Sequence, residues 1–206
     1  MTRARMPLIA AVALLAPVLL FAQSAKQEKA TAKKMSDSQK IANAMSAAPE
    51  GISKDAAIMD WSDTPKGQSR QLRAGTNGWV CYPNTPAEFE GASGEDPMCL
   101  DKEWQKWAEA WMSKTEPKVS ATGIGYMLRG DRGASNTDPF ATSATASNQW
   151  VISPPHIMVL YQDLKLLDAY PTDPKTGGPW VMWKGTPYAH VMVPVSATKM
   201  ATMPPK

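Results

Sequence analysis

Only two cysteines, Cys81 and Cys99, occur in the 206-residue chain, so a disulfide within the chain has one pairing available. A disulfide that closes a loop of this size stabilises a fold by about 3 kcal/mol, because it restricts the unfolded chain. The alternative is a pair of redox-active or metal-binding thiols. The spacing is not Cys-x-x-Cys, however, and two cysteines alone lack the remaining ligands of a zinc site. We therefore expect a structural disulfide, as oxidising compartments permit.

The N-terminal residues have the pattern of a secretory leader. Two arginines precede an apolar run from Pro7 to Ala22, and small residues up to Ala25 suit cleavage by a signal peptidase. A membrane anchor needs about 20 apolar residues, whereas this run is shorter and contains Pro17. We expect residues 1–25 to be a signal peptide, the protein to be periplasmic or secreted, and no transmembrane segment to remain after cleavage.

Charge and length limit what the mature chain can be. The chain carries a formal net charge of +3, but two of its arginines lie in the leader, and the rest shows no basic stripe. Nucleic acid is therefore not an expected partner. Roughly 180 residues suit a single core. We expect a flexible tether at 26–50 with a short helix over Asp37 to Ala47, one globular domain at 51–196, and a frayed tail at 197–206.

Helix and strand patterns are mixed along the chain. The clearest helix runs from Lys102 to about Ser113, with Asp101 as its N-cap and tryptophans spaced on one face. Strand patterns occur at 56–61, 71–73, 79–82, 123–128, 150–152, 156–161, 180–183 and 189–195. An Asn-Gly turn predicts a hairpin between 71–73 and 79–82. Because helices and strands do not alternate regularly, we expect an α+β fold, with a largely antiparallel sheet and the tryptophan-rich helix packed on it.

Four sequence blocks carry a resemblance to a known group of proteins. They are Gly75–Cys81, Asp96–Asp101, Ser135–Phe140 and Gly185–His190. They resemble a family of exported bacterial proteins of uncharacterised function, over about residues 50–195. The resemblance implies a secreted single-domain protein. It implies no reaction, ligand or catalytic residue.

The two histidines have matching surroundings, since His156 and His190 are each followed two residues later by a methionine, Met158 or Met192. Residues two apart in a strand project to one face, so each histidine lies with its methionine. If the two strands are neighbours, an imidazole pair and a thioether pair converge. Such ligands suit copper, and thioethers favour Cu(I). The alternative is that the methionines simply pack in the core. Copper is the one cofactor that the sequence suggests.

Eight tryptophans are many for this length and suggest a binding surface. Trp180 and Trp183 are three apart in a predicted strand, so one of the two is expected to be more exposed. Tyr188 is expected to join them in an aromatic rim. The function that this pattern favours is a binding or envelope-associated module, whose partner is an unidentified small molecule or envelope component. The tryptophans of the helix are expected to form its core face.

A histidine-dependent hydrolase is the remaining alternative. His156 or His190 would act as a general base, and Asp138 would orient it. The chain has no Gly-x-Ser-x-Gly elbow, no His-Glu-x-x-His helix and no phosphate-binding loop. No catalytic residue is therefore assigned. The arrangement of the two imidazoles distinguishes these alternatives.

Overall fold

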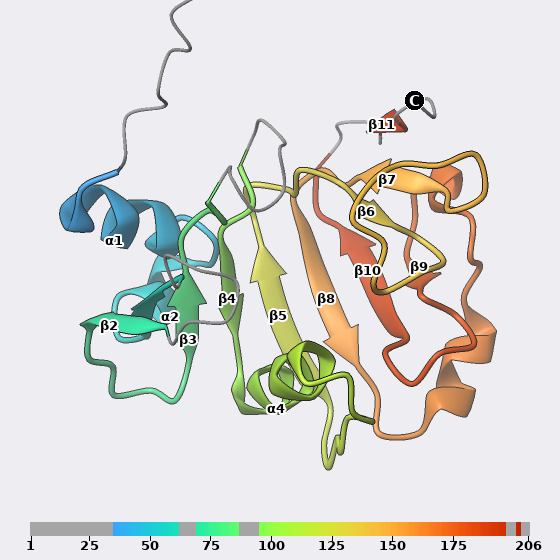
Figure 1. Ribbon diagram of the computed structural model, residues 1–206. Helices are drawn as coiled ribbons and strands as arrows, with labels where there is room; N and C mark the ends of the chain where they lie inside the picture. The colour runs from blue at the N-terminus through green and yellow to red at the C-terminus, as the bar shows by residue number, and fades with distance from the viewer. Residues whose placement is uncertain (1–34, 62–68, 87–94, 197–200, 203–206) are drawn as a thin grey trace, which may run out of the picture. The chain divides into compact units, whose positions relative to one another are not determined.

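An eight-stranded sheet runs through the protein in the computed structural model, which describes residues 35–61, 69–86, 95–196 and 201–202 (Figure 1). The strand order is β2 (Arg70–Arg73), β1 (Ala57–Asp60), β3 (Val80–Tyr82), β4 (Met98–Leu100), β5 (Gly123–Met127), β8 (His156–Leu160), β10 (His190–Pro194) and β9 (Trp180–Met182). The pair β1 and β3 is parallel, and every other neighbouring pair is antiparallel. The predicted α+β fold with a largely antiparallel sheet is confirmed.

Helices and a small second sheet complete the fold. The second sheet contains β6 (Ala134–Ser135), β7 (Trp150–Ile152) and β11 (Ala201–Thr202). The helices are α1 (Asp37–Met45), α2 (Glu50–Ser53) and α4 (Lys102–Met112), with the 3-10 helices η1 (Leu164–Ala169) and η2 (Pro174–Thr176).

Helix α4 is the predicted tryptophan-rich helix, and it lies across one face of the large sheet (Figure 1). Asp101 caps it by accepting a hydrogen bond from the Trp104 amide at 2.9 Å. The same carboxylate accepts one from the Ile124 amide at 2.5 Å, which joins the helix to β5. A Cβ at Gly125 would lie 2.9 Å from Met158 Cε and 3.4 Å from the Trp104 ring. Glycine on β5 therefore lets α4 approach the sheet closely.

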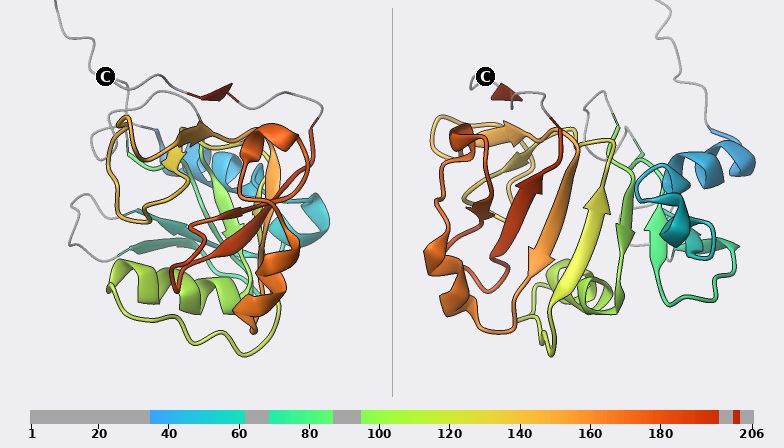
Figure 2. Two further views of the ribbon diagram at one scale, coloured as in Figure 1. Left: turned by 90° about the vertical axis from the view of Figure 1, so that its right-hand side faces the viewer. Right: turned by 180° about the vertical axis from the view of Figure 1, so that it is seen from behind.

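The opposite face of the sheet is covered at its two ends. Helix α1 packs over the end that carries β1, β3 and β4, and Leu167 of η1 packs on Val181 and Val191 at the other end. Seen from behind, none of the described helices covers the middle of this face (Figure 2). The face under α4, by contrast, holds the largest buried cluster, so the main core lies there.

Ser36 caps helix α1 and forms a reciprocal pair of hydrogen bonds with Gln39. Ala44, which the helix turns toward β3 and β4, is completely buried. Helix α1 therefore belongs to the same compact unit as the sheet. Small alanine side chains pack closely here, although few large apolar residues mark this helix in the sequence.

The disulfide prediction is confirmed. Cys81 on β3 and Cys99 on β4 are directly opposite and bonded to each other. The predicted hairpin between 71–73 and 79–82 is wrong, because β2 and β3 lie on opposite sides of β1. Gly75 in the connection comes so close to β1 that a Cβ there would lie 2.0 Å from the Ala57 amide nitrogen. The connection thus passes the end of β1 instead of turning back beside it.

The predicted leader and the first part of the tether, residues 1–34, lie outside the described residues. So does the predicted tail, apart from β11, which pairs with β7. Among the described residues, no helix has both the length and the apolar character that a membrane span needs.

Candidate functional site

The face under α4 carries both histidines and their methionines. Met158 on β8 is directly opposite Met192 on β10, while His156 is opposite Pro194. Directly opposite residues of an antiparallel pair project to the same face. The thioether pair predicted from the sequence is therefore formed. The imidazole pair is not, because the antiparallel register puts His156 and His190 at opposite ends of the methionine pair, roughly 14 Å apart between Cα atoms.

Each histidine also has a methionine directly across from it on its other side. Met127 on β5 is opposite His156, and Met182 on β9 is opposite His190. Met127, Met158, Met182 and Met192 all belong to the buried cluster on this face. Met127 and Met182 have no signal in the sequence that links them to the histidines, because strand alternation does not indicate which strands pair with β8 and β10.

The imidazole of His156 has one nitrogen in use and one without a partner. Its Nδ1 lies 2.7 Å from the carbonyl oxygen of Pro154, which can only accept, so Nδ1 carries the proton. Nε2 therefore carries the lone pair. Nε2 is buried and has no hydrogen-bond partner among the described residues. Burial lowers the pKa of His156, while the nearby charge of Asp131 opposes that shift.

Asp131 is the carboxylate whose charge acts on the pKa of His156. Its Oδ1 accepts hydrogen bonds from the amides of Gly133 and Ser153, each at 2.9 Å. Burial raises the pKa of Asp131, and attraction to His156 together with these hydrogen bonds opposes the rise. Asp131 was not singled out from the sequence, in which it is one acid in a polar loop.

The imidazole of His190 is surrounded by tryptophans instead. Its ring stands nearly perpendicular to the rings of Trp104, Trp107 and Trp183, with centroid distances of 5.1–5.6 Å. Its Nδ1 donates to the carbonyl oxygen of Tyr188 at 3.0 Å. Burial is the main reason that the pKa of His190 falls to about 4, and the charge of His156 lowers it further.

From His190 an aromatic cluster extends to the surface. Trp107 is parallel to Trp183 at 5.7 Å between centroids and to Trp111 at 6.5 Å. Trp111 in turn is parallel to Phe140, at 6.3 Å and 11°. Phe140 is 39% exposed and Trp111 is partly exposed, whereas Trp107 is buried. The cluster therefore ends in an aromatic surface, which we call the Trp111–Phe140 surface.

The ligand-binding residues predicted from the sequence are mostly covered. Trp180 is 0% exposed, and its indole N–H donates to Asn136 Oδ1. Trp183 is 9% exposed, and its indole N–H donates to the carbonyl oxygen of Ser135 at 2.6 Å. Both rings are thus buried, contrary to the expected contrast between the two faces of a strand. The reason is that β9 ends at Met182, and Trp183 follows in the left-handed region with φ 57°.

Tyr188 lies beneath the surface formed by Trp111 and Phe140. It is 5% exposed, and its ring stands at 82° to that of Phe140 with a centroid distance of 5.4 Å. Its hydroxyl donates to the carbonyl oxygen of Thr115 at 2.9 Å. Tyr188 therefore supports the aromatic surface from below and does not form its rim.

The hydrolase alternative gains no support from the geometry. Asp138 Oδ1 accepts a hydrogen bond from the Phe140 amide, and the Asp138 amide donates to Ser135 Oγ, so these bonds stay within its own loop. Both histidines are buried, with an exposed fraction of 0% for His156 and 2% for His190. A general base that is not in contact with solvent has no route to a substrate in this conformation.

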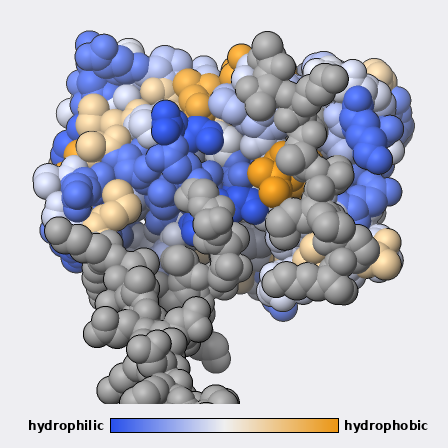
Figure 3. Space-filling model, turned by 90° about the horizontal axis from the view of Figure 1, so that it is seen from above, coloured by the Kyte–Doolittle hydropathy of each residue, from blue (hydrophilic) through white to orange (hydrophobic). Residues whose placement is uncertain are grey.

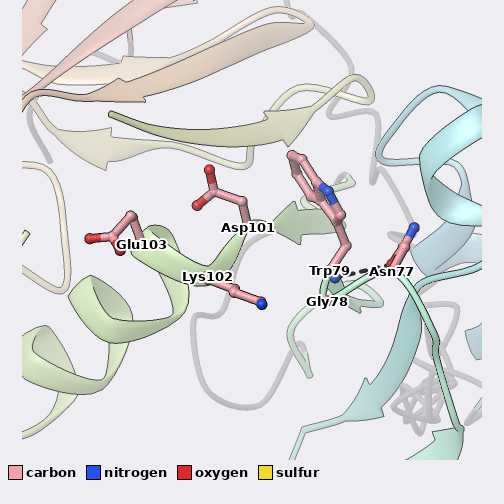
Figure 4. Close-up of a pocket in the computed structure, with 6 residues that line it drawn as sticks. All are labelled: Asn77, Gly78, Trp79, Asp101, Lys102 and Glu103. Atoms are coloured by element: carbon pink, nitrogen blue, oxygen red, sulfur yellow. Dashed lines mark hydrogen bonds between the residues drawn. The ribbon is translucent and has the colours of Figure 1, made fainter. Parts of the chain in front are cut away.

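A shallow surface pocket of about 310 Å³ lies beside the start of α4 (Figure 4). Asp101, Glu103, Lys102, Gly78, Asn77 and Trp79 line it. The carboxylates of Asp101 and Glu103 point away from Asn77 and Trp79 (Figure 4). Asp101 caps α4, and Glu103 forms an ion pair with Lys106 at 2.6 Å. Because both acids already have structural partners, this pocket is a weaker candidate than the face under α4.

Comparison of the chain with protein-family models, with curated proteins and with solved structures found no match. The resemblance to exported bacterial proteins therefore stays a prediction. Two arrangements on the face under α4 are the candidates for a functional site, the methionine–histidine row and the aromatic cluster.

Proposed function

We propose that this protein is a non-enzymatic binding module of the periplasm or extracellular space, and that its ligand packs a ring against the Trp111–Phe140 surface. The observation that carries the proposal is the exposure of Phe140, 39% of a large apolar side chain, at the end of a buried aromatic stack. Exposed aromatic rings that adjoin a rigid core are typical of sites that recognise sugars and other ring-shaped ligands.

The surface is held in place before any ligand arrives. The indole N–H of Trp111 donates to the carbonyl oxygen of Pro139 at 2.9 Å, which joins the helix to the loop that carries Phe140. Trp111 is also parallel to the buried Trp183, at 6.4 Å between centroids. A binding surface whose rings are already ordered loses little side-chain entropy when the ligand binds. This preorganisation supports a recognition role.

Charge adds a second element of recognition. Lys114 Nζ lies 5.1 Å from the centroid of the Phe140 ring. A cation beside an aromatic surface favours ligands that carry a carboxylate, phosphate or sulfate group next to their ring. Acidic sugars and acidic ring compounds of the cell envelope are therefore the ligand class that we propose.

The test is tryptophan fluorescence of the oxidised protein titrated with a panel of neutral and acidic saccharides. We expect saturable quenching by acidic members of the panel, and Phe140→Ala should weaken it by on the order of tenfold, since exposed hot-spot rings contribute about 1–2 kcal/mol or more. Leu166→Ala, which removes an exposed apolar side chain from η1, is the matched control and should change nothing. A flat response across the panel would remove the basis for this proposal.

The proposed location rests on a separate observation. The bond between Cys81 and Cys99 is buried and joins two neighbouring strands, as expected of a disulfide that forms in an oxidising compartment. Mass spectrometry of the protein from its native host should find the cysteines oxidised and the leader removed. Reduced cysteines on a chain that keeps its leader would contradict export.

A further inference from the structure

His156 presents a buried nitrogen with a lone pair and no partner. Folded proteins rarely leave such an atom unsatisfied, because removing a polar group from water without a hydrogen bond is unfavourable. The other ring nitrogen, Nδ1, donates to the backbone carbonyl of Pro154 at 2.7 Å and so leaves Nε2 as the unprotonated atom. This is also how metal-binding imidazoles are held, with one nitrogen on a backbone carbonyl and the other on the ion.

The strand register places three methionines near His156 on the same face of the sheet. Met127 is directly opposite on β5, Met158 is two residues further along β8, and Met192 is opposite Met158 on β10. Cβ atoms of directly opposite residues lie about 5 Å apart, and those of diagonal neighbours about 7–8 Å apart. Methionine has three rotatable bonds, so all three sulfur atoms can turn toward one point near the imidazole.

The ligand set selects the ion. One neutral imidazole and three thioethers are soft and carry no charge, which favours Cu(I) over the harder divalent ions. The carboxylate of Asp131 attracts positive charge at the position of His156, so it would partly compensate a buried monovalent cation. Met127 and Met158 keep 6% and 8% exposure, so these two thioether side chains retain a small contact with solution although His156 is buried. Seen from above, the surface of the molecule carries hydrophilic residues together with several hydrophobic ones (Figure 3).

The other end of the methionine pair has different surroundings. His190 also has a methionine directly across, Met182, but Trp104, Trp107 and Trp183 stand around its ring. Among the described residues, the buried imidazole nitrogen that lacks a partner is that of His156. These two differences favour the His156 end.

We infer that His156, Met127, Met158 and Met192 form a Cu(I)-binding site, in which His156 Nε2 and the three thioether sulfurs are the ligands. This inference does not depend on the ligand proposed for the Trp111–Phe140 surface. It differs from the site expected from the sequence, because Met127 takes the place of His190.

The test is an anaerobic titration of the disulfide-bonded protein with Cu(I), supplied as its acetonitrile complex, in competition with the chromophoric chelator bathocuproine disulfonate. The intact Cys81–Cys99 bond keeps thiolates out of the measurement. We expect one Cu(I) per chain. Met127→Leu and His156→Gln should each weaken binding by on the order of tenfold or more, since even supporting residues of a metal site contribute that much.

The other end of the methionine pair provides the matched controls. Met182→Leu and His190→Gln alter the residues that correspond to Met127 and His156, and both should leave Cu(I) affinity within about twofold of the wild type. X-ray absorption of the wild-type complex, which needs no variant to fold, should show sulfur ligands together with one imidazole. The inference fails if the folded protein takes up no Cu(I), if the copper has only nitrogen or oxygen ligands, or if the control variants lose affinity as much as the site variants.

Discussion

The two histidine ends of the α4 face have the same local sequence pattern and different surroundings. Each imidazole donates its Nδ1 hydrogen to the carbonyl two residues earlier, and each has a methionine directly across and another two residues along its own strand. At His156 the neighbouring charge is Asp131 and Nε2 has no partner among the described residues. At His190 three indole rings surround the imidazole.

The contrast shows that the β8–β10 strand pair and helix α4 determine different properties of the two histidine ends. The antiparallel register between β8 and β10 makes the two ends nearly equivalent within the sheet. The tryptophans of helix α4 gather around only one of them, so one end becomes an aromatic core and the other keeps a candidate ligand nitrogen. Four predictions test this contrast.

Trp107→Ala should have the largest effect, because it removes the ring that is parallel to Trp183 and stands against His190. Replacing a buried tryptophan by alanine typically costs about 3–5 kcal/mol of unfolding free energy. Urea denaturation followed by circular dichroism measures this loss. A cost below about 1 kcal/mol would mean that the tryptophans do not hold the His190 end together.

Acid should destabilise the protein through His190. The pKa of His190 is about 4 in the folded protein against an ordinary value of 6.5, so the unfolded chain binds the proton first as the pH falls. The full stability is present above about pH 6.5, and about 3 kcal/mol is lost by pH 4. Urea titrations at several pH values between these two limits measure how the free energy of unfolding changes with pH.

His190→Gln is the control for this pH dependence, because it removes the titrating ring and leaves the other ionisable groups in place. The change of unfolding free energy with pH should differ between the wild type and the variant, and that difference measures the effect of His190. Asp131, at the other end, should act in the opposite direction, since its raised pKa makes the folded protein the better proton acceptor. If the unfolding free energy changes with pH equally in the wild type and the variant, burial does not lower the pKa of His190 as stated.

Met192→Leu should cost less than about 1.5 kcal/mol of unfolding free energy, because leucine nearly conserves the volume of methionine in a core. Met192 is buried and faces Met158 in the middle of the row, so it is shared by both ends. The same variant should lose Cu(I) affinity if the sulfur is a ligand. Thermal or urea unfolding, measured beside the copper titration, separates the packing role from the ligand role.

Phe140→Ala should have the smallest effect on stability, within about 0.5 kcal/mol, because its ring is partly in solvent. Its effect on ligand quenching should be much larger. Urea denaturation beside the saccharide titration measures both quantities. A stability loss above about 2 kcal/mol would make Phe140 part of the core and not of a binding surface.

Local features of the sequence were sufficient for several parts of the fold. The spacing of Trp104, Trp107 and Trp111 predicts one face of α4, and Asp101 marks its start, because helix periodicity and capping depend on neighbouring residues. The Cys81–Cys99 bond follows from the count of cysteines. The placement of each histidine with its methionine on one face follows from the alternation of side chains along a strand.

Long-range packing sets which of these residues meet. The register between β8 and β10 brings Met158 and Met192 together and separates the histidines, and β5 adds Met127. The end of β9 at Met182 turns Trp183 inward, and the 136–140 loop brings Phe140 onto Trp111. These contacts join segments far apart in the chain. They depend on which strands pair and where α4 lies, and a periodic pattern in one segment carries no information about its partners.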